Sequence, residues 1–185
     1  AEWHSKLYEA NEVLAEKYPG SPYTADALIN LGNKHFNAAS PEDIDDAERI
    51  RLYKLAIEKY QQALDTPGIS TASKSTAKSF LKDTSISLAA DVYIQATANL
   101  DKAKRADRDV QKAAIESVVA EFLDIIKIYP DTKYGDLSFA QIGEHVSKYR
   151  GNFVWTEHNL LDVFQVQFEA EFKETTLILD DGTEI

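Results

Sequence analysis

Apolar residues recur every three or four positions along most of the first 150 residues. This is the spacing of one apolar face of an α-helix. Proline, glycine and short polar runs interrupt the pattern and separate the helical stretches. The pattern predicts helices over five stretches: residues 3–18, 22–38, 43–65, 107–129 and 132–149.

The middle segment, residues 70–103, has almost no helix breakers, but its first ten residues are polar. It predicts either one long helix or two helices with a kink near Asp83. The polar run 70–79 is then either the solvated start of a helix or a loop. The apolar stripe of this segment consists of Phe80, Ile86, Leu88, Ala89, Val92, Tyr93 and Ala96.

The pattern changes near the C-terminal end, where apolar and polar residues alternate over residues 164–173. Strict alternation favours a half-buried strand. A helix is the competing interpretation, because Phe164, Phe168 and Phe172 are also four positions apart. A short helix is expected just before this stretch, at residues 153–162.

A second β-prone run follows at residues 175–179, with a turn signal at Asp180-Asp181-Gly182. A ribbon of two strands is marginal in water, so it must pack on the helices, pair with another chain or belong to a longer sheet. An open strand edge also invites strand addition from a neighbour. The candidate contacts with a partner or another copy are therefore Phe164, Val166, Phe168, Phe172, Leu177 and Leu179.

One arrangement of turn residues occurs twice, 111 positions apart. The first copy consists of Tyr18-Pro19, Tyr23 and Gly32, and the second, at the same spacings, of Tyr129-Pro130, Tyr134 and Gly143. Repetition of a helix–turn–helix unit is typical of stacked helical arrays. We therefore expect helical hairpins that share one continuous interior.

The residues of this repeated turn have physical reasons to end one helix and begin another. Proline cannot continue a helix, because it lacks an N–H and clashes with the preceding turn. Ser21 in the first copy, and Asp131 or Thr132 in the second, offer an oxygen to the open N–H groups of the next helix. Pro22 suits the first helical position. The glycine of each copy is expected to let a neighbouring helix backbone approach closely.

Two further patterns resemble the tetratricopeptide-repeat family. In that family the first helix of a repeat carries a Leu-Gly pair, and the second carries a small residue, an aromatic residue and an alanine before a terminating proline. Leu31-Gly32 matches the first pattern. The second pattern is matched by Ala56, Tyr60, Ala63-Leu64 and Pro67.

This resemblance covers residues 5–150 and implies a mainly α fold, a TPR-like array of antiparallel helical hairpins. The expected organisation is a helical repeat domain at residues 1–152. It is followed by residues 153–185, which would hold a short helix and a C-terminal β-hairpin that could contact another subunit.

The Tyr-Pro-x-x-x-Tyr variant of the repeat is similar to divergent repeats of bacterial envelope proteins. These include lipoproteins of the outer-membrane assembly machinery and the coordinator of the Tol-Pal system. The resemblance implies a non-catalytic scaffold in the periplasm or on the cell surface. The absence of cysteine fits an extracytoplasmic protein that avoids stray oxidation. Many cytosolic chains also lack cysteine, so a cytoplasmic location stays open.

The formal net charge is −11, and residues 157–185 contribute most of it, with eight acidic residues and one base. An acidic protein repels phosphate backbones, so nucleic acid is not an expected partner. No apolar run reaches the ~18 residues of a transmembrane helix. A basic cluster that includes Lys104, Arg105 and Arg108 is either a solvated helix end or a receptor for the acidic C-terminus of a neighbouring copy.

No motif for catalysis or cofactor binding is present: there is no glycine-rich phosphate loop, HExxH, CxxC or Gly-x-Ser-x-Gly. The four histidines are scattered, and His35 and His145 suit packing positions of the repeat. The acidic run at residues 43–48 fits the first turn of a helix and lacks the spacing of a calcium loop. We therefore predict no enzyme activity, no catalytic residue, no cofactor and no metal site.

The leading functional hypothesis is a scaffold that binds a protein or peptide in the groove of the helical array. The alternative is a structural subunit of an extracellular filament that polymerises through strand addition at its C-terminal ribbon.

Overall fold

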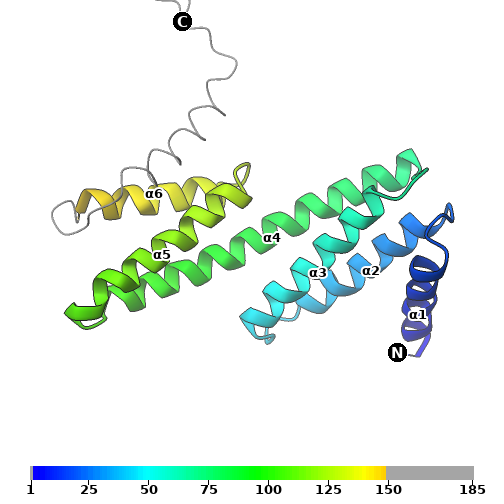
Figure 1. The fold of residues 1–185 in the computed structure, drawn as a ribbon. Coiled ribbons are helices and arrows are strands. Elements are labelled where there is room, and N and C mark those ends of the chain that lie inside the picture. Colours follow the sequence, from blue (N-terminus) through cyan, green and yellow to red (C-terminus); the bar gives the residue numbers. More distant parts are fainter. Residues whose placement is uncertain (1, 149–185) are drawn as a thin grey trace, which may run out of the picture. The chain divides into compact units, whose positions relative to one another are not determined.

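A computed structural model describes residues 2–148 and confirms that this part of the chain is mainly α-helical (Figure 1). Its helices are α1 (Glu2–Lys17), α2 (Thr24–Ala39), α3 (Asp46–Leu64), α4 (Thr71–Lys104), α5 (Arg108–Ile128) and α6 (Lys133–Lys148). The middle segment is one continuous helix, so its polar start is helical and not a loop. The short helix and the ribbon expected after residue 152 lie outside the described residues.

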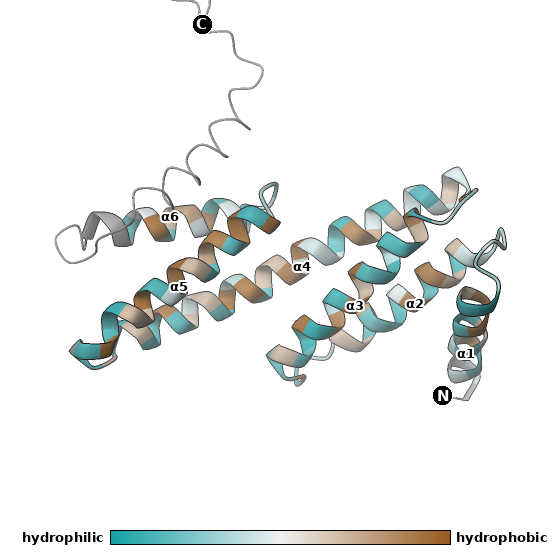
Figure 2. Cartoon of the chain, viewed as in Figure 1, coloured by the Kyte–Doolittle hydropathy of each residue, from teal (hydrophilic) through white to brown (hydrophobic). Residues whose placement is uncertain are grey.

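The chain divides into two compact units, Ala1–Gln141 and Ile142–Ile185. The packing described below lies within the first unit. Over residues 2–148, none of the helices combines the length and the apolar content that a bilayer span requires. Figure 2 shows polar and apolar residues mixed along the helices.

Capping side chains define where two of the helices begin. The carboxylate of Asp45 accepts hydrogen bonds from the N–H groups of Ala47 at 3.0 Å and Glu48 at 3.2 Å, so the predicted acidic run does begin a helix. The hydroxyl of Ser70 accepts from the N–H of Ser73 at 3.0 Å at the start of α4. Each such cap stabilises a helix by about 1 kcal/mol.

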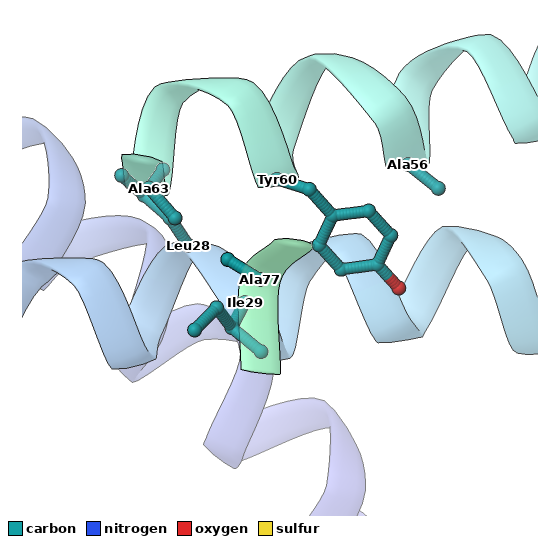
Figure 3. Close-up of a cluster of buried hydrophobic side chains, with 6 residues drawn as sticks. All are labelled: Leu28, Ile29, Ala56, Tyr60, Ala63 and Ala77. Carbon is teal, nitrogen blue, oxygen red and sulfur yellow. The ribbon is translucent and has the colours of Figure 1, made fainter. Parts of the chain in front are cut away.

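Tyr60 of α3 is at the centre of the core that joins α2, α3 and the start of α4 (Figure 3). Its side chain is 1% exposed, and its hydroxyl donates to Oδ1 of Asn33 at 2.7 Å. Burial raises the pKa of Tyr60 to about 12, so the phenol stays neutral. The rest of this cluster consists of Leu28, Ile29, Ala56, Ala63 and Ala77.

The two repeated glycines have different surroundings. A Cβ added at Gly32 would overlap the ring of Tyr60, so Gly32 makes room for a side chain. The atoms nearest to an added Cβ belong to this ring and not to a helix backbone. At Gly143 an added Cβ would meet none of the described atoms within 4 Å, so no described helix makes the predicted close approach there. The residues that carry the tetratricopeptide resemblance, Gly32 and Tyr60, thus pack directly on each other.

The buried face of α4 changes direction halfway along the helix. In the first half Ala77, Thr84 and Leu88 are buried, and this half packs on α3. The second half, which packs on α5, buries Ala89, Ala96, Leu100 and Ala103. Because Leu88 and Ala89 are neighbours, the two stripes differ by one helical step of about 100°.

The second half of α4 forms a hairpin with α5. Tyr93 of α4 lies against Phe122 of α5, with ring centroids 5.9 Å apart, and against Tyr134 of α6 at 5.8 Å. The side-chain amide of Asn99 donates to both carboxylate oxygens of Glu121, at 3.0 and 3.3 Å. The buried face of α5 consists of Ile115, Val118, Val119, Phe122, Ile125 and Ile126, at helical spacing.

The apolar stripe predicted for the first helix is poorly covered. Trp3 is 72% exposed, Tyr18 is 59% exposed and Leu7 is 37% exposed. α1 packs chiefly on α2, where the carboxylate of Glu12 pairs with Nζ of Lys34 at 3.0 Å. The amphipathic pattern therefore predicted the helix correctly but not the burial of its apolar side.

Candidate functional site: a groove beside Tyr129

The turn between α5 and α6 positions the side chain on which the candidate site depends. The N–H of Tyr129 donates to the carbonyl of Ile125 at 2.9 Å, and the backbone then leaves the helix at φ −127° and ψ 49°. The hydroxyl of Thr132 donates to the carbonyl of Tyr129 at 2.9 Å and accepts from the N–H of Gly135 at 3.3 Å. Thr132 is therefore the predicted capping residue of this turn, and the turn holds Tyr129 in a defined direction.

The ring of Tyr129 packs against the buried cluster that contains Tyr53 of α3 and Leu88 of α4. Burial raises the pKa of Tyr129 above its ordinary value. The phenol is therefore neutral at physiological pH, and it presents an apolar ring with a polar edge to its surroundings.

A hollow of about 560 Å³ lies beside this ring, between α3, α4 and the turn after α5. Its apolar lining includes Ile86, which is 37% exposed, and Ile128, which is 63% exposed. Side chains of this size are commonly buried in a folded protein. Two lysines, Lys54 and Lys82, also line the hollow, together with Asp131.

A second hollow, of about 360 Å³, shares Lys54, Ile128 and Tyr129 with the first. It continues along α4 and α5, where Asn99, Glu121 and Asp124 line it. The hydrogen bonds from Asn99 hold the carboxylate of Glu121 in place at this end. We call the two hollows together the Tyr129 groove.

The charges of the Tyr129 groove are unevenly distributed along its length. Lys82 lines only the larger hollow, whereas Glu121 and Asp124 line only the smaller one. Within the described part of the chain, the side chains of Lys54, Lys82 and Asp124 make no ion pair. The groove therefore has an acidic end and a more basic end, with apolar side chains between them.

Of the candidate contact residues predicted from the sequence, Lys104 and Arg105 line neither hollow of the groove. Lys104 is in the last turn of α4, where its ammonium pairs with Asp101 at 3.8 Å, and Arg105 is the C-cap of that helix. Arg108 is the first residue of α5. A base in the last turn of a helix is favourable with the helix dipole. The six apolar candidates of the ribbon, from Phe164 to Leu179, lie outside the described residues.

The described residues hold no group of three or more His, Asp or Glu side chains that could bind a metal ion. His35 of α2 is half-buried, and burial lowers its pKa below 6.5, with further lowering by the charge of Lys34.

Sequence reasoning singled out the turn at Tyr129 but missed the other residues of the groove. The apolar faces from which the helices were predicted do not include Lys54, Lys82 or Ile128. An apolar residue on the polar side of a helix, such as Ile128 directly before Tyr129-Pro130, was the available signal.

Comparison of the chain with family models, with curated proteins and with solved structures finds no match in any of the three. The functional proposal below therefore depends on the geometry of the Tyr129 groove and on the resemblance of the repeated turn.

Proposed function

We propose that this chain is a non-catalytic scaffold that binds a segment of a partner protein in the Tyr129 groove. The single observation that carries the proposal is the exposure of Ile128 and Ile86 beside the ring of Tyr129, in hollows that continue one another. A concave surface that combines exposed aliphatic side chains, an aromatic ring and a few charges is typical of a protein-binding site.

The packing of the helices that form the groove supports the same proposal. α3 and α4 are joined by buried clusters, and α4 and α5 by the contacts of Tyr93 and Asn99. A preformed groove loses little conformational entropy when a partner binds, which favours affinity. We also propose that the scaffold acts in the bacterial envelope, because its Tyr-Pro-x-x-x-Tyr turn is similar to the repeats of envelope scaffolds.

Replacement of Ile128 by glutamate tests the proposal. Ile128 is 63% exposed, so Ile128→Glu leaves the core intact but places a charge in the apolar part of the groove. Val110→Glu is the matched control, because Val110 is 56% exposed on the same helix and lines neither hollow. We expect the wild-type chain and V110E to capture the same partner from an envelope extract, and I128E to lose it.

Equal capture by all three proteins, or no capture by the wild type, would contradict the proposal. Self-assembly through the C-terminal ribbon, the alternative suggested by the sequence, depends on residues that the structure does not describe. Deletion of residues 164–185 separates the two functions, because groove binding survives this deletion and ribbon-mediated assembly does not.

A further inference from the structure

We propose, on the basis of the function proposed above, that the Tyr129 groove binds an extended segment whose charges have a fixed order. The segment carries a lysine or arginine at one end, apolar side chains in the middle and an aspartate or glutamate at the other end. The partner is thus a protein segment of stated chemistry, and its charges decide the direction in which it binds.

The acidic end of the groove selects the basic residue of the segment. Glu121 and Asp124 lie one turn apart on α5 and line the same hollow, where they outnumber its one base, Lys54. Asn99 donates to both oxygens of Glu121, which fixes this carboxylate without neutralising its charge. Two carboxylates beside one another attract a cation, and the guanidinium or ammonium of a bound side chain supplies it.

The other end of the groove selects the acidic residue. Lys82 of α4 lines only the larger hollow, whereas Lys54 of α3 lines both hollows and lies between the two ends. Asp131 lines the larger hollow as well and offsets part of their charge. The acidic residue of the segment therefore contributes less to binding than its basic residue.

The length of the groove sets the length of the segment. Lys82 and Asn99 mark its two ends on α4, and at 1.5 Å per residue they stand about 26 Å apart along the helix axis. An extended chain advances about 3.3 Å per residue, so the groove holds about eight residues. The apolar middle of the segment then lies over Ile86, Ile128 and Tyr129.

Selection of peptides on the 185-residue chain tests this proposal. Random peptides longer than the groove are displayed on phage, and the selection is repeated on two variants. In E121K/D124K the acidic end is reversed. In D109K an exposed acid of the same helix, which lines neither hollow, is reversed as a control.

We expect the wild type and D109K to enrich peptides with a basic residue, an apolar stretch and an acidic residue in constant order. A synthetic peptide of that sequence should bind E121K/D124K about tenfold more weakly. Replacing its basic residue by glutamate should restore its binding to E121K/D124K.

The outcomes distinguish this inference from the function on which it rests. Peptides that bind wild type but not I128E, and that share no charge order, would overturn the inference and leave the proposed function standing. Charge-ordered peptides that bind E121K/D124K as well as wild type would also overturn it. Failure to enrich any peptide that depends on Ile128 would overturn both.

Discussion

The two Tyr-Pro turns share a pattern of backbone hydrogen bonds but differ in the burial of their tyrosines. In the first, the N–H of Tyr18 donates to Leu14 and that of Ser21 to Tyr18, at 3.1 and 2.9 Å. The equivalent bonds of the second turn are those of Tyr129 to Ile125 and Thr132 to Tyr129, at 2.9 and 3.2 Å. The two turns are thus equivalent in their backbone hydrogen bonds.

The tyrosines of the two turns differ in exposure. Tyr18 and Tyr23 are 59% and 67% exposed. Tyr129 packs against the cluster around Leu88, and Tyr134 packs against Tyr93. Tyr134 thus contacts α4, and Tyr129 contacts a cluster that α2, α3 and α4 share.

The comparison shows which part of a repeat is local and which is not. The backbone hydrogen bonds that follow Tyr-Pro are the same in both copies. α6 nevertheless begins at Lys133, two positions earlier in the repeated turn than Thr24 of α2. The burial of the tyrosines depends on the neighbouring helix. In the second copy Tyr129 lines the groove, whereas the first copy meets α4 through Asp26, whose carboxylate accepts a hydrogen bond from Ser73 at 2.6 Å.

The largest expected difference between the copies is at their glycines. Gly32→Ala should lower the free energy of unfolding by about 3 kcal/mol, because its Cβ overlaps the buried ring of Tyr60. Gly143 is the equivalent residue of α6 and is exposed, so Gly143→Ala should raise the free energy of unfolding by up to about 1 kcal/mol through helix propensity. Urea denaturation of both variants measures these changes in the free energy of unfolding. Equal destabilisation would show that the two glycines have the same role.

The residues one position after Tyr23 and Tyr134 provide the next test. A Cβ at Gly135 would lie 2.9 Å from the carbonyl oxygen of Tyr129, so Gly135→Ala should cost about 2 kcal/mol. Thr24 is the equivalent residue, and its hydroxyl donates to the carbonyl of Tyr18 at 2.6 Å. Thr24→Ala should cost about 1 kcal/mol, since it loses one hydrogen bond. Thermal unfolding of the two variants measures both losses of stability. A larger loss for Thr24→Ala than for Gly135→Ala would contradict the close packing at Gly135.

Removing the two tyrosine rings tests the difference in burial directly. Tyr129→Ala should cost about 1.5 kcal/mol, because a half-buried ring leaves the cluster around Leu88. Tyr18→Ala should change stability by less than about 0.5 kcal/mol, as expected for an exposed side chain. The same denaturation curves report both values. A Tyr18→Ala variant as unstable as Tyr129→Ala would show that the first turn is also covered.

The smallest effect is expected from His35, which follows the glycine of the first copy. Burial lowers the pKa of His35. The pKa is lowered further by the positive charges of Lys34, Lys59 and Arg51, and the carboxylate of Glu12 opposes this shift. A base with a lowered folded pKa contributes stability above its unfolded pKa of 6.5, and loses that stability as the pH falls through the folded value. Between about pH 7 and about pH 5, His35→Gln should therefore lose less stability than wild type. A steeper loss of stability in His35→Gln than in wild type would contradict the lowered pKa of His35.

The helices were predictable because each of them, α4 excepted, keeps one apolar face along its length. Residues 107–129, for example, repeat apolar side chains at the spacing of a helix, and α5 follows that prediction closely. α4 left two interpretations open because its buried face turns by about 100° at Leu88 and Ala89. A helix that packs on two neighbours in succession shows no single stripe.

The groove was less predictable, because it depends on contacts between helices distant in sequence. Tyr129 was marked by its repeated turn, yet nothing in the order of residues connects it with Lys54 or Lys82. The exposure of α1 was likewise hidden, since an amphipathic pattern reports what a helix could bury and not whether a neighbour is present.

Photo-crosslinking at three positions tests most directly whether the groove of the second copy is the binding surface. A benzoylphenylalanine replaces Ile86, which lines the groove, Ile94, which is 61% exposed on the same helix and lines neither hollow, or Tyr18 in the first turn. Each protein is irradiated in an envelope extract. We predict a specific adduct from position 86 and none from positions 94 and 18. An adduct from position 18 alone, or equal adducts from all three positions, would contradict the assignment of the Tyr129 groove.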